Sequence, residues 1–566
     1  MSGKIHYEVF FKKNKKAGWA LMEAFNDRDS AIKLATGLVA KNKDGSVRVT
    51  KEKYDEETRS FRAVPVYEAG AEKYGAIEEK SSEARLPCLT PDDLSKPHAR
   101  DTIRRVLTGW LERVQAVPME LLHRVDLVED LEASGTDLQH AVQKVAVASA
   151  RENDANVQSF VKQLNELVQK ALSRVYKDAR DKRLPSYPKK TPFRDIANDI
   201  YGKDKRPYSL RAAMADRISH ERKYADKLEV LLDMSDGLPE DEDARNFALA
   251  EVDAYIAEVI SFDAGREAML GQCKDLGETL ERLACLFDGD ATADALNLAP
   301  RASKRLAKKI ESRELEACRS VIAAALLKEL ERPGRLRPTS VRDEVRLARD
   351  LAARLVIVAD SLLPADALIK AFTARSARLL QTDTVDEYLR NANDPNEEIE
   401  RLLALEENLV GETNKAKLAS YIRGIAGSSR AESHYVRGEG QPLERLAKLT
   451  ALQTRVLRGT YPKKDKLELA GSFDALGMKI VDESKILNMV ESGDRSCLDK
   501  ATALLRLATG GALPLGHCCS DAQARAIRHL KFAVSQNETL SDEGRAKLKG
   551  IQILMKQLDA AKQQAA

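Results

Sequence analysis

Helical spacing of apolar residues constrains the fold of this 566-residue chain more than any other feature. From about residue 101 onward, apolar residues recur every three or four positions, which places them on one face of a helix. The clearest case is a stripe made of Val157, Phe160, Val161, Leu164, Leu167, Val168, Leu172 and Val175. A helix with such a stripe packs on a neighbour, so the sequence predicts a mainly α protein.

Pro and Gly residues interrupt this pattern in clusters, for example at 185–207, 333–338 and 510–516. Such clusters end helices and start turns, so they divide the chain into helical hairpins. A short motif at 399–403 is echoed at 443–447, but the neighbouring intervals do not repeat it. We therefore expect an irregular multi-helical array, not a regular repeat array.

The N-terminal residues 1–69 follow a different pattern. Apolar and polar residues alternate from residue 5 to residue 11, as in a half-buried strand. A second strand at 19–25, a helix capped by Asn26 or Asp27, and strands near 47–49 and 61–66 follow. The sequence predicts a small ββαββ (α+β) domain, in which one helix covers a four-stranded antiparallel sheet.

Domain borders are expected where the pattern changes. Residues 70–100 lack periodicity and collect Pro, Gly and Ser, which is typical of a linker. The predicted organisation is an α+β domain at 1–69, a linker at 70–100, a helical domain at 101–233 and a helical array at 234–566, with a candidate division at 333–338.

The charge balance and the pattern of apolar residues and cysteines argue against several classes of function. Lys and Arg number 92 against 89 for Asp and Glu, so the net charge of +3 gives no overall attraction to nucleic acid or membranes. No signal-peptide pattern and no long apolar run occurs, and the seven cysteines fit a reducing compartment. We expect a cytoplasmic protein that does not insert into membranes.

Motifs of known chemistry are missing from the sequence. It contains no Walker loop, no His-Glu-x-x-His and no Gly-x-Ser-x-Gly, and the glycines at 438–440 follow no predicted strand. We therefore predict no cofactor, no metal and no catalytic residue, and the balance leans against an enzyme.

Two basic segments are the candidate contact surfaces. Segment 12–16 is a lysine-rich hairpin beside aromatic residues, and segment 174–211 mixes cations with tyrosines and prolines. The candidate residues are Lys12, Lys13, Lys15, Lys16, Arg180, Lys182, Arg183, Lys189, Lys190, Lys205 and Arg206. Contact with an anion or a partner competes here with plainer interpretations: a solvated turn for the first segment, and a loop that wraps neighbouring helices for the second.

Adjacent Cys518 and Cys519 form the candidate reactive thiol. Adjacent residues do not readily share one tetrahedral metal ion, so a zinc site is disfavoured. We expect one of the two cysteines in the core and the other partly exposed.

The leading functional hypothesis is a non-enzymatic interaction or regulatory protein, in which a helical scaffold holds protein partners and carries a tethered N-terminal recognition or sensing domain. An alternative is a nucleic-acid-associated factor that binds through segments 12–16 and 174–211. A further alternative is an enzyme whose site no motif reveals.

Overall fold

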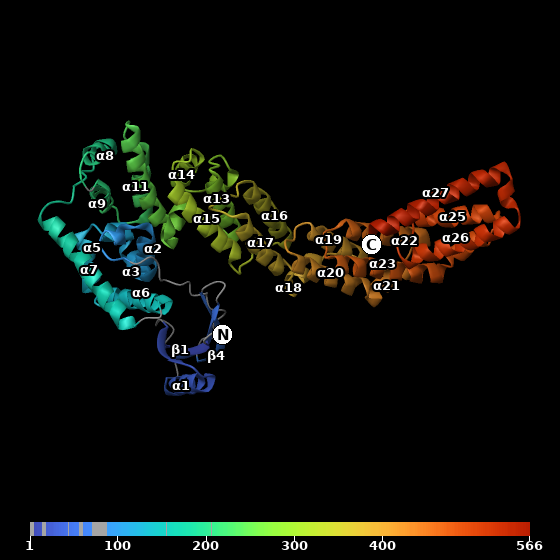
Figure 1. Ribbon diagram of the computed structural model, residues 1–566, viewed down its shortest axis with the longest axis horizontal. Coiled ribbons are helices and arrows are strands. Elements are labelled where there is room, and N and C mark those ends of the chain that lie inside the picture. The colour runs from blue at the N-terminus through green and yellow to red at the C-terminus, as the bar shows by residue number, and fades with distance from the viewer. Residues whose placement is uncertain are drawn as a thin grey trace. The chain divides into compact units, whose positions relative to one another are not determined.

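The computed structural model describes residues 5–13, 19–42, 45–55, 60–70, 88–153, 156–204 and 206–565. These residues form a mainly helical protein with a small N-terminal sheet (Figure 1), which confirms the predicted fold class. The chain divides into two compact units, Met1–Arg266 and Glu267–Ala566. The borders read from the sequence remain predictions.

The N-terminal domain has the predicted ββαββ order. Its elements are β1 (Ile5–Lys12), β2 (Ala20–Phe25), α1 (Arg28–Lys41), β3 (Ser46–Asp55) and β4 (Ser60–Gly70). The strands pair antiparallel in the order β2-β1-β3-β4. Asp27 caps α1, since its carboxylate accepts a hydrogen bond from the backbone N–H of Ser30 at 2.8 Å.

One face of this sheet packs on α1. Val9, Val47 and Val49 are buried against Ala31 and Ala35 of the helix. Because side chains alternate along a strand, the polar residues between these valines lie on the opposite face. The helix-facing side of the sheet therefore supplies the core of the domain.

Helices make up the described remainder of the first unit, after a 3₁₀ helix at Asp93–Ser95. They are α2 (Pro97–Val106), α3 (Thr108–Val114), α4 (Pro118–Leu121), α5 (Val125–Ala133), α6 (Asp137–Asn153), α7 (Val157–Arg180), α8 (Phe193–Tyr201), α9 (Arg206–Ile218), α10 (Tyr224–Asp236) and α11 (Glu242–Ser261), with α12 (Asp263–Leu270) at the border of the units. Part of the expected linker is thus ordered, and its residues 71–87 lie outside the described residues.

Helix α11 runs through the core of this unit. Asp241 caps its N-terminus, because the carboxylate of Asp241 accepts a hydrogen bond from the N–H of Ala244 at 2.9 Å. Its inner residues Val252, Ile256 and Ile260 are completely buried. A helix buried on several sides fixes its neighbours, so α11 positions the helices that pack around it.

Helix α7 is covered along only part of its apolar stripe. Asn156 caps its start, and Leu167, Leu172 and Val175, from the middle of the helix onward, are buried. Val157, at the first position of the helix, is 38% exposed. The N-terminal half of α7 therefore leaves apolar surface uncovered.

The second unit is mainly helical, and many of its helices pack against near neighbours in the chain. They are α13 (Leu276–Asp288), α14 (Arg301–Glu311), α15 (Glu316–Glu331), α16 (Val341–Ile357), α17 (Ala365–Leu379), α18 (Thr382–Leu389), α19 (Pro395–Glu406), α20 (Glu412–Ala426), α21 (Ser429–Val436), α22 (Pro442–Arg458), α23 (Lys463–Ser484), α24 (Ile486–Glu491), α25 (Cys497–Thr509), α26 (His517–Ser535) and α27 (Asp542–Ala565). Figure 1 shows α25, α26 and α27 side by side, and one apolar core continues from α16 to α27.

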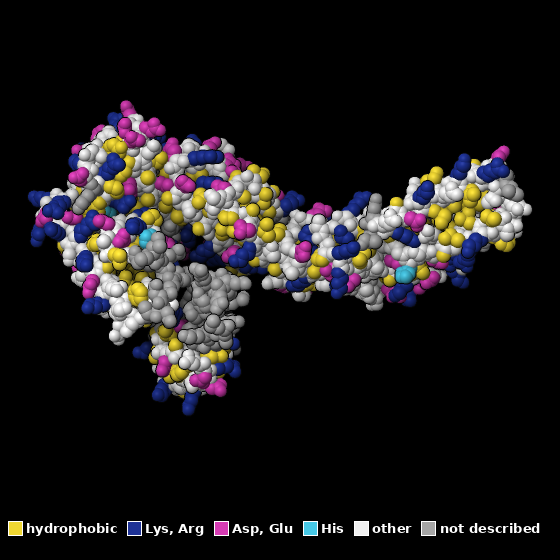
Figure 2. All heavy atoms as spheres, viewed as in Figure 1, with side chains coloured by type: hydrophobic (Ala, Val, Ile, Leu, Met, Phe, Trp, Pro, Cys, Tyr) yellow, Lys and Arg dark blue, Asp and Glu magenta, His cyan; other side chains and the backbone are white. Residues whose placement is uncertain are grey.

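The surface carries charges of both signs. Figure 2 shows Lys and Arg side chains interspersed with Asp and Glu over the visible face. Among the described helices, none combines the length and the apolar composition that crossing a bilayer requires.

Candidate functional site

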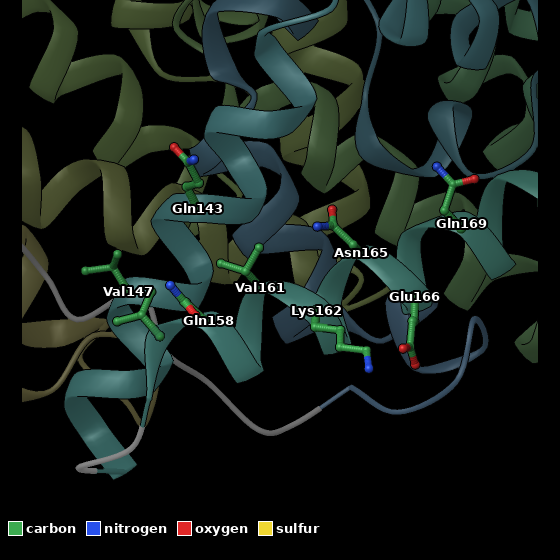
Figure 3. Close-up of a pocket in the computed structure, with 9 residues that line it drawn as sticks. Gln143, Val147, Gln158, Val161, Lys162, Asn165, Glu166 and Gln169 are labelled. Atoms are coloured by element: carbon green, nitrogen blue, oxygen red, sulfur yellow. The ribbon is translucent and has the colours of Figure 1, made fainter.

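A groove between α6 and α7 is the main candidate site of the first unit. It encloses about 770 Å³. Figure 3 shows Val147 of α6 beside Gln158 and Val161 of α7. The residues that line the groove are Gln143, Val147, Val157, Gln158, Val161, Lys162, Asn165, Glu166 and Gln169. The groove lies along the half of α7 that leaves its apolar stripe partly uncovered.

The chemistry of this groove is apolar at its centre and neutral at its border. Three valines form the apolar part, and four side-chain amides surround it. An amide both donates and accepts hydrogen bonds, so these groups can pair with a polypeptide backbone. Among the described residues that line the groove, the only charged ones are Lys162 and Glu166, which have opposite signs. The groove therefore has no net attraction for a polyanion.

The cations of the predicted basic segment 174–211 are mostly engaged within the fold. Arg180 pairs with Asp181 at 3.3 Å, and Arg183 pairs with the same carboxylate at 3.4 Å. Arg206 lies over the ring of Tyr201 at 4.6 Å. Exposed ion pairs of this kind contribute little to stability, but they engage these cations within the fold.

Tyrosines anchor the same segment. Tyr187 is buried, and its backbone N–H donates to Asp216 at 2.8 Å. Tyr208 donates its O–H to Asp178 at 2.9 Å. Much of the segment belongs to α7, α8 and α9, so the expected loop is confined mainly to residues 181–192, where Tyr187 anchors it.

A basic surface nevertheless remains near the end of α7. Lys182, Lys189 and Lys190 are exposed, and no ion pair or hydrogen bond of their side chains occurs within the described parts of the chain. A hollow of about 570 Å³ nearby is lined by Lys170, Arg174, Lys177 and Arg183 together with two aspartates. Lys205 lies outside the described residues.

The lysines of segment 12–16 differ in exposure. Lys12 is only 9% exposed, whereas Lys13 is exposed at the end of β1. Lys15 and Lys16 lie outside the described residues. Trp19 has the guanidinium of Arg48 over its ring, 5.0 Å from the centroid. The described part of this hairpin thus offers one exposed lysine.

Cys518 and Cys519 are both completely buried in the first turn of α26. The expectation that one of them is partly exposed is wrong. Asp474 accepts hydrogen bonds from the backbone N–H groups of His517 and Cys518, at 2.6 and 3.0 Å, which holds this turn against α23. Burial raises the pKa of both thiols, that of Cys519 to about 12. A buried thiol with a raised pKa does not readily form a reactive thiolate.

We expect these two thiols to react slowly with a thiol reagent such as dithionitrobenzoate at neutral pH. The partly exposed cysteines, Cys88, Cys273 and Cys497, should be labelled first. Cys518 and Cys519 should be labelled only at the rate of unfolding, as should the other buried cysteines. Peptide mapping by mass spectrometry after timed labelling measures the order. Early labelling of Cys518 or Cys519 would instead support a thiol sensor.

A buried cluster of charges inside the first unit was not predicted from the sequence. Glu120 of α4 and Lys227 of α10 are both buried, with their charged atoms 2.6 Å apart. Arg100 of α2 pairs with Glu258 of α11, and Glu258 also accepts the N–H of Met119 at 2.9 Å. Each charge has a partner of opposite sign. We interpret the cluster as a clamp that joins four helices.

His123 lies at the edge of this cluster and is 3% exposed. Its Nδ1 donates to the carbonyl of Met119 at 2.7 Å, so the ring is the tautomer with the proton on Nδ1. Burial, together with the charges of nearby arginines, lowers the pKa of His123 to about 3. The imidazole is therefore neutral at physiological pH.

Sequence spacing could have found only one part of this cluster. Glu120 and Arg124 are close in the sequence and pair at 2.7 Å, although Arg124 lies beyond the end of α4. The partners of the other charges lie far away in the chain. Lys227 is 107 positions from Glu120.

No group of three or more His, Cys, Asp or Glu side chains placed to hold a metal ion occurs in the part of the chain that the structure describes. Comparisons of the chain with protein-family models, with curated proteins and with solved structures found no match. The function is therefore inferred from the surfaces of the chain itself.

Proposed function

We propose that this chain is a non-enzymatic interaction or regulatory protein, a helical scaffold that holds protein partners and carries the ββαββ domain as a tethered recognition or sensing domain. The observation that supports the proposal best is the α6–α7 groove. Its partly uncovered valines sit within a border of amides on two long helices.

An apolar centre with a polar border is typical of protein interfaces. The centre of such an interface is depleted of charge, and its border supplies hydrogen bonds. The two helices pack against each other, and both contribute residues to the groove. A partner that places apolar side chains over Val147 and Val161 would cover the uncovered part of the stripe.

A nucleic-acid-associated factor is the second candidate. The exposed Lys182, Lys189 and Lys190, and the hollow lined by cations of α7, favour it. Binding through such lysines would fall steeply as salt is raised, because it depends on counterion release.

Affinity capture of the intact protein from its native lysate, at low and raised salt and with and without nuclease, tests the proposal. We compare the wild type with Val157→Glu, which puts a charge into the groove. Glutamate at the first turn of a helix is favourable, so this variant should fold. Leu443→Glu is the matched control, since Leu443 lies in the first turn of α22 and is 40% exposed.

The expected result is a set of proteins that survives nuclease and salt, is lost with Val157→Glu and is retained with Leu443→Glu. Capture dominated by nucleic acid, and lost on nuclease treatment or in raised salt, would favour the second candidate. An empty capture, or one that Val157→Glu leaves unchanged, would contradict a partner site in this groove.

A further inference from the structure

A second pocket lies in the other unit, between α19, α20 and α22. It encloses about 890 Å³ and also involves the loop that follows α22. Three cations and two carboxylates line it: Lys415, Arg455, Arg458, Glu406 and Glu407. Threonines and the apolar side chains of Leu403, Ala447 and Ala451 complete the lining.

Glu406 and Lys415 form a fixed part of this pocket. One carboxylate oxygen of Glu406 accepts hydrogen bonds from the N–H of Thr460 at 3.1 Å, from its hydroxyl at 2.6 Å and from Lys415 at 3.0 Å. Burial works to raise the pKa of Glu406, but these hydrogen bonds outweigh it and keep the pKa below its usual value. Glu406 is therefore a charged group that is already satisfied.

The hydroxyl of Tyr461 is the anomaly. Tyr461 lines the pocket and is 5% exposed, and its hydroxyl has no hydrogen-bond partner among the described residues. Buried hydroxyls are nearly always paired, because an unpaired one has lost its water without replacement. Gly459 packs closely against this ring, since a Cβ there would lie 3.0 Å from the ring of Tyr461 and 3.3 Å from Glu406.

Two arginines face the same pocket from the last turn of α22. Arg455 has only a loose partner, the exposed Glu407 at 3.8 Å. The side chain of Arg458 makes no ion pair or hydrogen bond with any residue that the structure describes. Their place at a helix C-terminus explains why cations are tolerated there. It does not explain a buried hydroxyl without a partner beside them.

From these groups we infer that the α19–α22 pocket binds a carboxylate, which accepts a hydrogen bond from Tyr461 and pairs with Arg455 and Arg458. Guanidinium groups match the two oxygens of a carboxylate. The lining carries three positive and two negative charges, and the resulting charge of +1 balances a monoanion better than a phosphate dianion. The apolar part of the lining suits a ligand with an apolar body.

Benzoate is the first probe, with benzamide as its uncharged counterpart. Saturation-transfer NMR on the full-length protein should detect benzoate and not benzamide. Tyr461→Phe and Arg458→Gln should each weaken benzoate binding by about tenfold, because each removes a hydrogen bond to a charged group. Arg437→Gln is the control, since Arg437 ends α21 and lies outside the lining.

The carboxylate has two sources, a free small molecule or the C-terminus of a polypeptide. An acetylated Leu-Leu peptide with a free carboxylate, compared with the same peptide as an amide, distinguishes them. Tighter binding of the free peptide than of benzoate assigns the site to a polypeptide terminus. Equal or weaker binding assigns it to a small carboxylate. Either result supports the carboxylate site.

Stability of the ligand-free protein supplies an independent readout. Tyr461→Phe should leave its thermal midpoint unchanged or higher, since no hydrogen bond is lost. Tyr435→Phe should lower the midpoint, because Tyr435 is buried and donates its O–H to Asn396 at 3.0 Å. A lower midpoint for Tyr461→Phe would overturn the inference. So would absent benzoate binding, equal binding of benzamide, or unchanged binding by Tyr461→Phe. Because the pocket and the α6–α7 groove belong to different units, either inference can fail alone.

Discussion

Replacing Arg375 with Met should open the loop between α15 and α16 and weaken the second unit by about 3–5 kcal/mol. Arg375 of α17 is 3% exposed. Its guanidinium donates to the carbonyls of Leu330 at 2.8 Å, Arg332 at 2.7 Å and Glu329 at 3.1 Å, and also to that of Gly334. Methionine fills much of the same space but leaves these carbonyls without a donor.

The charge of Arg375 is retained at neutral pH. Burial and the neighbouring Arg378 lower the pKa of Arg375 to about 10, which is still well above physiological pH. The guanidinium of Arg375 therefore stays protonated. This one side chain donates hydrogen bonds both to the end of α15 and to the loop that follows. The effect of the substitution should be concentrated at residues 329–336.

Hydrogen exchange measured by mass spectrometry locates the change. Amides at residues 329–336 should exchange much faster in Arg375→Met, and trypsin should cut sooner after Arg335, whereas Pro338 protects the bond after Arg337 in both proteins. Arg346→Met is the matched control, because the Arg346 side chain is 68% exposed. Equal exchange in both variants would show that the carbonyls find other donors and that Arg375 is not the clamp.

Local signals explain why much of the fold could be predicted from the sequence. Alternation near Val9 marks a strand, and the carboxylates of Asp27 and Asp241 cap the helices that follow them. Each of these features depends on residues a few positions apart. Such spacing is visible in a single chain without any knowledge of tertiary contacts.

The sites depend on contacts that spacing does not reveal. Lys227 and Arg375 lie on helices rich in charge, where a cation is normally solvated, and only the packing of distant segments buries them. Tyr461 follows a helix end like any loop residue, and its unpaired hydroxyl is a property of the pocket around it. Conversely, the dense cations of segment 174–211 predicted a contact surface, but several of these cations are paired within the fold.

Acidification should destabilise the first unit through His123. Its pKa is 6.5 in an unfolded chain and about 3 in the folded protein, chiefly because burial disfavours the imidazolium. Above pH 6.5 the imidazole of His123 is neutral in both the folded and the unfolded protein, so it does not reduce the free energy of unfolding. As the pH falls below 6.5, His123 binds a proton in the unfolded chain but stays neutral in the folded protein. Stability should therefore fall by about 2–3 kcal/mol between pH 6.5 and about pH 4.5.

Comparison with His123→Gln isolates this contribution. Glutamine can still donate to the carbonyl of Met119 but does not titrate, so its stability should change much less over the same pH range. The nearby Glu258 works in the opposite direction, because burial raises its pKa and the folded protein takes up a proton there as the pH falls. Both proteins share that effect, so it cancels in the difference between them.

The two tryptophans of the chain make the measurement specific to the first unit. Trp110 is 3% exposed and donates its indole N–H to Asp130 at 3.1 Å, so its fluorescence should report unfolding of the helices around His123. In a Trp19→Phe background, urea titrations at several pH values give the free energy of unfolding for both proteins. Parallel pH curves would mean that His123 is protonated in the folded state, whereas a steeper fall for the histidine protein is the expected result of a buried, neutral imidazole.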